Sequence, residues 1–210
     1  GPDVTTEQIG RAVLDRLRAL GVGELRVAVP DLAVAGIGVG VPGMVDMASG
    51  VVGDLPNLPG RWFDVPAGPL IATATGLTVG LINDAKAFAL AEHRLGAAAG
   101  AENALLVTVG TGVGGAVITH GELVYGVGGA AGEIGHLILQ PEGPRCTCGN
   151  LGCLETLASG PAIVGEAVRR VVQGFTTTMS GLSGDDLNAI TPELVARAAD
   201  DGDAVAADVL

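Results

Sequence analysis

The sequence predicts an α/β fold of two domains. Strand-like apolar segments alternate along the chain with segments of helical periodicity, which is the pattern of α/β proteins. The 210 residues can bury a sizeable core; 48% of them are hydrophobic but only 2% are aromatic, so this core must consist mainly of Ala, Val, Leu and Ile. The 35 glycines gather at a few sites without a repeating period, which indicates turns and close backbone approach rather than low complexity.

A helix and a strand open the first predicted domain, which covers residues 1–102. Apolar residues at helical spacing follow Thr5 and continue to Gly21, so a helix is expected between these two residues. From Val34 to Val41, apolar residues alternate with glycine. This alternation predicts a buried strand that ends in a Pro-Gly loop.

A loop, a strand and a helix complete this domain. The Pro- and Gly-rich stretch 55–69 holds the chain's only Trp and is expected to be a loop that lines a site. The apolar run 77–82 predicts a strand, and Asn83 and Asp84 after it are expected to cap a helix. A change of local pattern over 96–102 places the domain boundary there.

The second predicted domain, residues 103–210, begins with a β-hairpin. Apolar strands flank the turn from Gly110 to Gly115, and because a strand rather than a helix follows the glycines, the turn is not of the Rossmann type. A helix, a Thr/Ser/Gly-rich loop and a second helix are expected after it, over 166–172, 175–184 and 192–210 respectively.

Charge and hydropathy exclude some classes of function. The net charge is −12, and the cations are ten Arg and a single Lys, Lys86, which disfavours broad nucleic-acid binding because phosphate neutralisation needs a basic surface. The chain has no run of 18 apolar residues, and it begins with Gly1-Pro2 rather than with a signal peptide, so a cytoplasmic location is expected. Lys86 is expected on a helix surface, and His93 and His120 are expected at the surface without companion ligands.

Three cysteines and a histidine form the sharpest constellation in the sequence, since they all lie within eighteen residues: His136, Cys146, Cys148 and Cys153. Three thiolates and an imidazole satisfy tetrahedral Zn²⁺, and closure of all four positions makes the metal structural rather than catalytic. A disulfide would leave one Cys unpaired and is disfavoured in a cytoplasmic chain. The sequence therefore predicts a zinc site.

Two further motifs each have a functional and a structural interpretation. The glycines from Gly110 to Gly115 expose consecutive N–H groups, as a phosphate cradle requires, and Thr111 adds a hydroxyl; the alternative is a tight hairpin that needs positive φ. Asp84 follows an apolar strand, where its carboxylate can accept a proton from a substrate hydroxyl; the alternative is a helix N-cap.

Glu133 and Glu155 lie close in sequence to the proposed metal ligands. Carboxylates that project from a rigid metal-stapled segment are well placed to bind vicinal hydroxyls. The alternative interpretation is that both are ordinary solvated acids.

Taken together, these stretches resemble the ROK family of sugar kinases and sugar-responsive repressors, over residues 37–161. The resemblance rests on several motifs in the family's order: GVGVPGMVD over 38–46, IND over 82–84, the glycine hairpin, GEIGH over 132–136, and the Cys-x-Cys-x₄-Cys-Leu-Glu run that ends at Glu155. It implies an actin-like ATPase (ribonuclease H-like) fold of two α/β domains and a cytoplasmic, ATP-dependent hexose kinase of the glucokinase type.

The resemblance also implies a role for each matching residue. Asp84 is the general base that accepts the proton of a sugar hydroxyl, and zinc clamps the sugar-binding loop. Sugar binding falls to Gly43, through its backbone, and to Asn83, Asp84, Glu133, His136 and Glu155. Phosphates of ATP, with Mg²⁺, are cradled by Gly110, Thr111, Gly112, Gly114 and Gly115. Structural zinc is bound by His136, Cys146, Cys148 and Cys153.

The sequence departs from the family pattern at both ends. The family's Asp-x-Gly-Gly-Thr phosphate loop has no counterpart, and the chain stops before the family's closing helices, so a fragment is expected. Lys86 stands where kinases of this family often have Asn. The sugar-sensing domain of a ROK repressor and an N-acetylmannosamine or N-acetylglucosamine kinase stay as alternatives. Family members usually form dimers or tetramers, so a homo-oligomer is expected.

Overall fold

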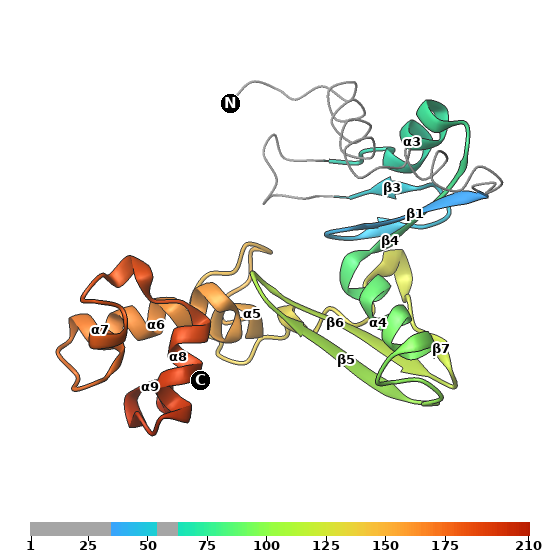
Figure 1. Cartoon of the computed structure of the whole chain (residues 1–210). Helices are drawn as coiled ribbons and strands as arrows, with labels where there is room; N and C mark the ends of the chain where they lie inside the picture. The colour runs from blue at the N-terminus through green and yellow to red at the C-terminus, as the bar shows by residue number, and fades with distance from the viewer. Residues whose placement is uncertain (1–34, 54–62) are drawn as a thin grey trace, which may run out of the picture. The chain divides into compact units, whose positions relative to one another are not determined.

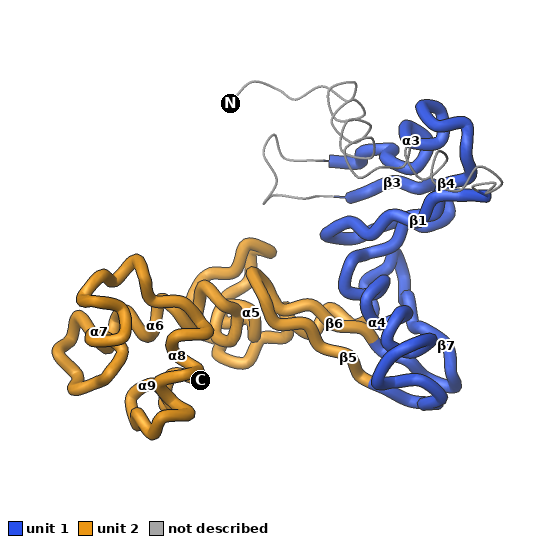
Figure 2. The backbone as a smooth tube through the Cα atoms, in the orientation of Figure 1, with its two compact units in different colours: residues 1–104, 117–131 blue, residues 105–116, 132–210 orange. Residues whose placement is uncertain are grey.

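The computed structural model describes residues 35–53 and 63–210, which form two compact units (Figures 1 and 2). The first unit consists of two stretches of chain, one up to residue 104 and one over residues 117–131. The second unit comprises residues 105–116 and 132–210. The chain passes from the first unit to the second after residue 104, close to the domain boundary predicted after residue 102. The division into two folding domains stays a prediction. The helix predicted between Thr5 and Gly21, and the Trp of the predicted loop, lie outside the described residues.

A parallel pair of strands with two helices beside it forms the framework of the first unit. β1 and β4 pair in parallel, from Gly36 opposite Thr78 to Val41 opposite Asn83. α3 packs against β4, and α4 follows β4 directly (Figure 1). The described elements of the first unit are β1 (Gly36–Val41), β2 (Val45–Asp46), β3 (Val51–Val52), α3 (Ala67–Thr75), β4 (Thr78–Asn83), α4 (Asp84–Leu95), β7 (Glu122–Leu123) and the 3₁₀ helix η1 (Val127–Gly129).

Small aliphatic residues form the core of this unit, as the composition predicts. The core residues are Val45, Val52, Val65, Ala67 and Leu81. The predicted strands near 34–41 and 77–82 are confirmed as β1 and β4, and the helix after Asn83 is confirmed as α4. The expectation that the first strand is buried is wrong, because exposed and half-buried residues alternate along β1.

The predicted loop over 55–69 is wrong in its last residues, where α3 begins at Ala67. Pro69 lies in the first turn of α3, where proline is tolerated because that N–H has no helical partner. Burial of Ala67 and Ile71 stabilises the helix, and Gly68 lies so close to Gly50 that a Cβ would come within 3.1 Å of its Cα.

The predicted β-hairpin is confirmed by the order β5-β6-β7 in a three-stranded sheet. β5 ends where the glycine turn begins, and β6 starts inside the turn at Val113, earlier than expected. The remaining elements are β5 (Ala104–Val109), β6 (Val113–Thr119), η2 (Ile134–His136), α5 (Leu154–Ala158), α6 (Gly160–Val172), α7 (Met179–Leu182), η3 (Leu187–Ala189), α8 (Pro192–Asp200) and α9 (Ala204–Val209).

The C-terminal helices differ from the prediction in three places. α6 begins at Gly160 rather than at residue 166, and Ser159 caps it by accepting the N–H of Ala162. α7 lies inside the segment expected to be a loop, where burial of Met179 overrides a composition rich in Thr, Ser and Gly. The single helix expected over 192–210 is two helices, α8 and α9, because Gly202 has a φ of +93° and Asp203 caps α9. The C-terminal helices α6 to α9 share one core, which consists of Ala167, Met179, Ile190, Val195, Ala198 and Ala206. In the part of the chain that the structure describes, no helix has the length and apolar character to cross a membrane.

Candidate functional site

The carboxyl ends of β1 and β4 bring three predicted site residues together. Gly43 lies in the loop after β1, while Asn83 ends β4 and Asp84 begins α4. The Nδ2 of Asn83 donates to the carbonyl oxygen of Gly43 at 3.0 Å, which ties the loop to the strand end. Gly43 has a φ of +77°, a conformation that favours glycine. Ligand sites of parallel α/β sheets form at this edge.

The N-cap of α4 is Asn83, not Asp84. The Oδ1 of Asn83 accepts a hydrogen bond from the backbone N–H of Lys86 at 3.1 Å. Asp84 is the first residue of the helix and is exposed. The one hydrogen bond described for its carboxylate comes from the neighbouring N–H of Ala85, which donates to Oδ1. The cap interpretation of Asp84 is therefore wrong, and its carboxylate is not required to begin the helix.

Lys86 is buried, which corrects the expectation of a helix-surface residue. Its side chain is only 1% exposed, and with Ala89 it forms the buried face of α4. α4 packs against both β1 and β4. No sequence pattern distinguished this face of the helix from the polar one.

The four predicted metal ligands come together in the second unit. Their ligand atoms, one from each of His136, Cys146, Cys148 and Cys153, all lie within 4.8 Å of one another. The Sγ of Cys146 is 3.6 Å from the Nδ1 of His136, and the Sγ atoms of Cys148 and Cys153 are 3.7 Å apart. Zinc bond lengths give tetrahedral edges of about 3.6 Å (S to N) and about 3.8 Å (S to S), so the donor set suits Zn²⁺ and these two distances match its tetrahedral edges.

Tight turns in the segment between Gln140 and Cys153 hold the cysteines in place. The N–H of Cys146 donates to the carbonyl of Asn150 at 2.8 Å, and the N–H of Gly149 returns to the carbonyl of Cys146 at 3.0 Å. Gly152 has a φ of +64°, and a Cβ at this position would overlap the carbonyl of Gln140. Gly152 is therefore required by the packing of the loop, whereas Gly149 has space for a Cβ and a φ of +99° that favours glycine.

The cysteine environments differ in their effect on the thiols. Burial, followed by hydrogen bonding with Cys148 and Cys146, raises the pKa of Cys153 to about 12. A backbone hydrogen bond from Asn150 lowers the pKa of the exposed Cys148. Since metal ligation requires thiolates, binding at this cluster releases protons and depends on pH.

Glu155 links the cluster to the glycine hairpin. Its Oε2 accepts a hydrogen bond from the N–H of Val113 at 3.1 Å, and its Oε1 lies 3.9 Å from the Sγ of Cys146. Sequence reasoning missed the first contact because no motif connects residues that are 42 positions apart. Glu133 precedes η2, where its carbonyl accepts the N–H of His136 at 3.1 Å.

The glycines of the hairpin fall into two groups. Gly110 and Thr111 are exposed and Gly112 is half-buried. The N–H of Gly110 donates to the carbonyl of Gly112 at 2.9 Å, so the accessible N–H groups of the turn are those of Thr111 and Gly112. Gly115 is instead buried, and a Cβ there would come within 2.5 Å of the Ile134 side chain. Its small size serves packing, so the phosphate-cradle prediction applies best to the exposed part of the turn.

Comparison with known proteins identifies relatives of two kinds. A profile of the ROK family matches residues 7–210. A glucokinase of Thermotoga maritima is 46% identical over 127 residues, which are 60% of this chain and 40% of that protein. A xylose repressor of Caldicellulosiruptor bescii is 35% identical over 172 residues, which are 82% of this chain and 42% of that protein. The chain spans about half the length of the curated relatives it matches.

Solved structures show the same two kinds of relative. A ROK family glucokinase from Streptomyces griseus, in complex with glucose and AMPPNP, matches with a TM-score of 0.79 and 32% identity, over 98% of this chain and 63% of that one. A ROK family transcriptional regulator, homologous to the Escherichia coli MLC protein, matches with a TM-score of 0.82 and 32% identity, over 97% of this chain and 49% of that one.

Proposed function

The chain belongs to the ROK family, and we propose that it is part of an ATP-dependent hexose kinase of the glucokinase type. The predicted actin-like ATPase fold, mixed α/β and present here in part, is confirmed by the match to ROK sugar kinases.

The exposed carboxylate of Asp84 carries the proposal. It lies at the carboxyl end of β4, beside a loop that Asn83 holds through Gly43, and it is not the helix cap. In this role Asp84 orients a sugar hydroxyl and accepts its proton as the hydroxyl oxygen attacks the γ-phosphorus of ATP and ADP leaves. A sensor domain has no chemical need for a base at this position.

Residues of the second unit take the remaining roles in the proposal. Glu133, His136 and Glu155 bind sugar hydroxyls, and the backbone N–H groups of Thr111 and Gly112 bind phosphate oxygens of ATP with Mg²⁺. The Cys₃His cluster holds structural zinc, which fixes the segment that ends at Glu155. A homo-oligomer stays a prediction.

The test is ATP-dependent phosphorylation by the full-length protein, with glucose, mannose, fructose, N-acetylglucosamine and N-acetylmannosamine as acceptors. Asp84→Asn should lower kcat by about 100-fold or more on the preferred sugar and leave sugar binding intact. Asp185→Asn is the matched control, because Asp185 is exposed and Asn tolerates its φ of +61°. Full turnover in Asp84→Asn would exclude Asp84 as the base.

A second candidate function is the sugar-sensing domain of a ROK repressor. The match to a ROK transcriptional regulator and to a xylose repressor favours it. Sugar binding without turnover on any acceptor would support the sensor and contradict the kinase. Turnover only on an acetylated amino sugar would support an amino-sugar kinase instead of a glucokinase.

A further inference from the structure

The position of Glu155 suggests a role beyond the predicted contact with sugar. α5 begins directly after Cys153, and Glu155 lies in its first turn. One carboxylate oxygen accepts the N–H of Val113 in the hairpin, and the other faces the Sγ of Cys146. A single side chain therefore contacts both the metal-ligand cluster and the glycine hairpin.

A second hydrogen bond from the same segment holds the other end of the turn. The N–H of Gly160, the first residue of α6, donates to the carbonyl of Gly110 at 2.8 Å. On another side Gly135 packs so closely that a Cβ there would overlap the carbonyl of Val113. The segment 155–160 thus fixes both Gly110 and Val113, the residues on either side of the exposed turn.

We propose that Glu155 is a positioning residue for the glycine hairpin. Its carboxylate holds the N–H of Val113 and thereby keeps the backbone N–H groups of Thr111 and Gly112 in one arrangement for phosphate oxygens, while the N–H of Gly110 closes the turn by donating to the carbonyl of Gly112 at 2.9 Å. The inference rests on the proposed function, because it assigns nucleotide phosphates to this turn. It predicts that nucleotide binding depends on Glu155 even when no sugar is present.

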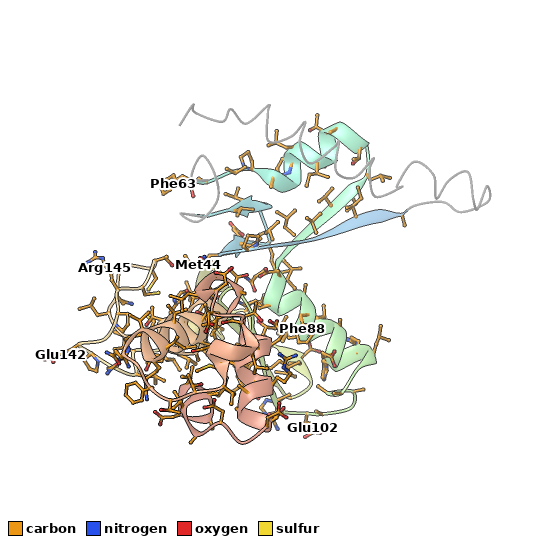
Figure 3. The ribbon with its side chains drawn as sticks, turned by 60° about the vertical axis from the view of Figure 1, so that its left-hand side comes forward. Met44, Phe63, Phe88, Glu102, Glu142 and Arg145 are labelled. Atoms are coloured by element: carbon orange, nitrogen blue, oxygen red, sulfur yellow. The ribbon has the colours of Figure 1, made fainter. Side chains whose placement is uncertain are left out.

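Amide hydrogen exchange tests the contact itself in the full-length protein. Glu155→Ala removes the acceptor and should raise the exchange rate of the Val113 N–H about tenfold or more. Glu155→Gln keeps an acceptor oxygen and should raise it less. Glu142→Ala is the control, because Glu142 is exposed in the same unit and points outward (Figure 3). Wild-type exchange in Glu155→Ala, or equally fast exchange in the Gln and Ala variants, would overturn the proposal.

Affinity for Mg²⁺-AMPPNP, measured without sugar, tests the consequence. Glu155→Ala should weaken this affinity by about tenfold and Glu155→Gln by less, whereas loss of a sugar contact alone would leave it unchanged. Glu155→Asp keeps the charge, but its side chain is one methylene shorter and should not reach the N–H of Val113. It replaces Glu155→Ala if the Ala variant does not fold. Equal nucleotide affinity in all variants would overturn the positioning role and leave the kinase proposal standing. If the wild-type protein binds no nucleotide, the proposed function fails. The amide exchange rate of Val113 then still decides whether Glu155 holds the hairpin.

Discussion

Cys148 is the most exposed of the three clustered cysteines, whereas Cys146 and Cys153 are 3% and 0% exposed. Its substitution therefore removes little packing, and any loss of stability reports on the metal. Cys148→Ser should reduce bound zinc from about one equivalent per chain to a small fraction and lower the Tm. Metal analysis and thermal unfolding of protein purified without chelator measure both effects.

A matched control for this substitution lies three residues earlier in the chain. Arg145 is exposed and points away from the second unit (Figure 3), so Arg145→Ala should keep both the zinc and the Tm of the wild type. Wild-type protein with almost no zinc would contradict the metal assignment itself. Full zinc content in Cys148→Ser would show that Cys148 is not a required ligand.

Asn83 combines two functions that substitutions can separate. Asn83→Ala removes the N-cap of α4 and the bond to Gly43, and should cost about 1 kcal/mol in the free energy of unfolding. Asn83→Ser keeps a cap oxygen but has no amide donor for the Gly43 carbonyl, so it should retain most of the stability and still raise the KM for sugar. Urea denaturation and initial rates measure the two effects, and a loss of stability in the Ser variant equal to that in the Ala variant would contradict the separation.

Residue types in the motifs indicated the chemistry, but not every contact. His136 and the three cysteines could be grouped from their spacing alone, because all four lie in one short segment. The burial of Lys86 and the bond from Val113 to Glu155 depend on which strands and loops pack together. Local sequence contains no such information, so these two features had to come from the structure.

Elements with strong local signals were predictable, and those stabilised by burial were not. β1, β4 and the hairpin of β5 and β6 show apolar runs bounded by Gly or Asn, and their positions follow the prediction. α3 and α7 contain Pro, Gly and Ser that locally favour loops, and they form because their buried side chains pack on neighbouring elements. Tertiary packing thus overrode propensity in both helices.

Asp203 determines where α9 begins and accounts for the break after α8. Its Oδ1 accepts the N–H groups of Val205 and Ala206, and its Oδ2 accepts bonds from Thr177 and Thr178. Burial acts to raise the pKa of Asp203, but these hydrogen bonds outweigh it and hold the pKa well below its usual range. Asp203→Asn should therefore cost about 1–2 kcal/mol at pH 7.

The cost of Asp203→Asn should depend on pH with a definite sign. Because the folded-state pKa is lowered, the stabilisation is fully present above the unfolded value of about 3.9 and is lost as the pH falls through the folded value. The difference in unfolding free energy between wild type and Asp203→Asn should shrink as the pH falls from about 5 to about 2. Asp201→Asn, at an exposed position two residues away, should show no such trend; a constant difference for Asp203→Asn would contradict the assignment.

At the scale of the whole molecule, each unit has its own core. Val45, Val52 and Leu81 belong to the core of the first unit, and Met179 and Val195 belong to that of the C-terminal helices. The sequence predicted two domains from a change of pattern near residue 100, but nothing in that pattern indicated that residues 117–131 belong to the first compact unit. Long-range pairing, rather than chain order, determines this membership.

This organisation predicts a local response to removal of the metal. All four ligands belong to the second unit, between His136 and Cys153, so a chelator should raise amide exchange in that segment and in α5. β1 and β4 should keep their protection, because the first unit contributes no ligand to the cluster and packs on its own core. Exchange measured by mass spectrometry before and after chelation, with zinc added back as the control, tests this. Equal loss of protection in β1 and β4 would show that the metal stabilises the whole chain and not the second unit alone.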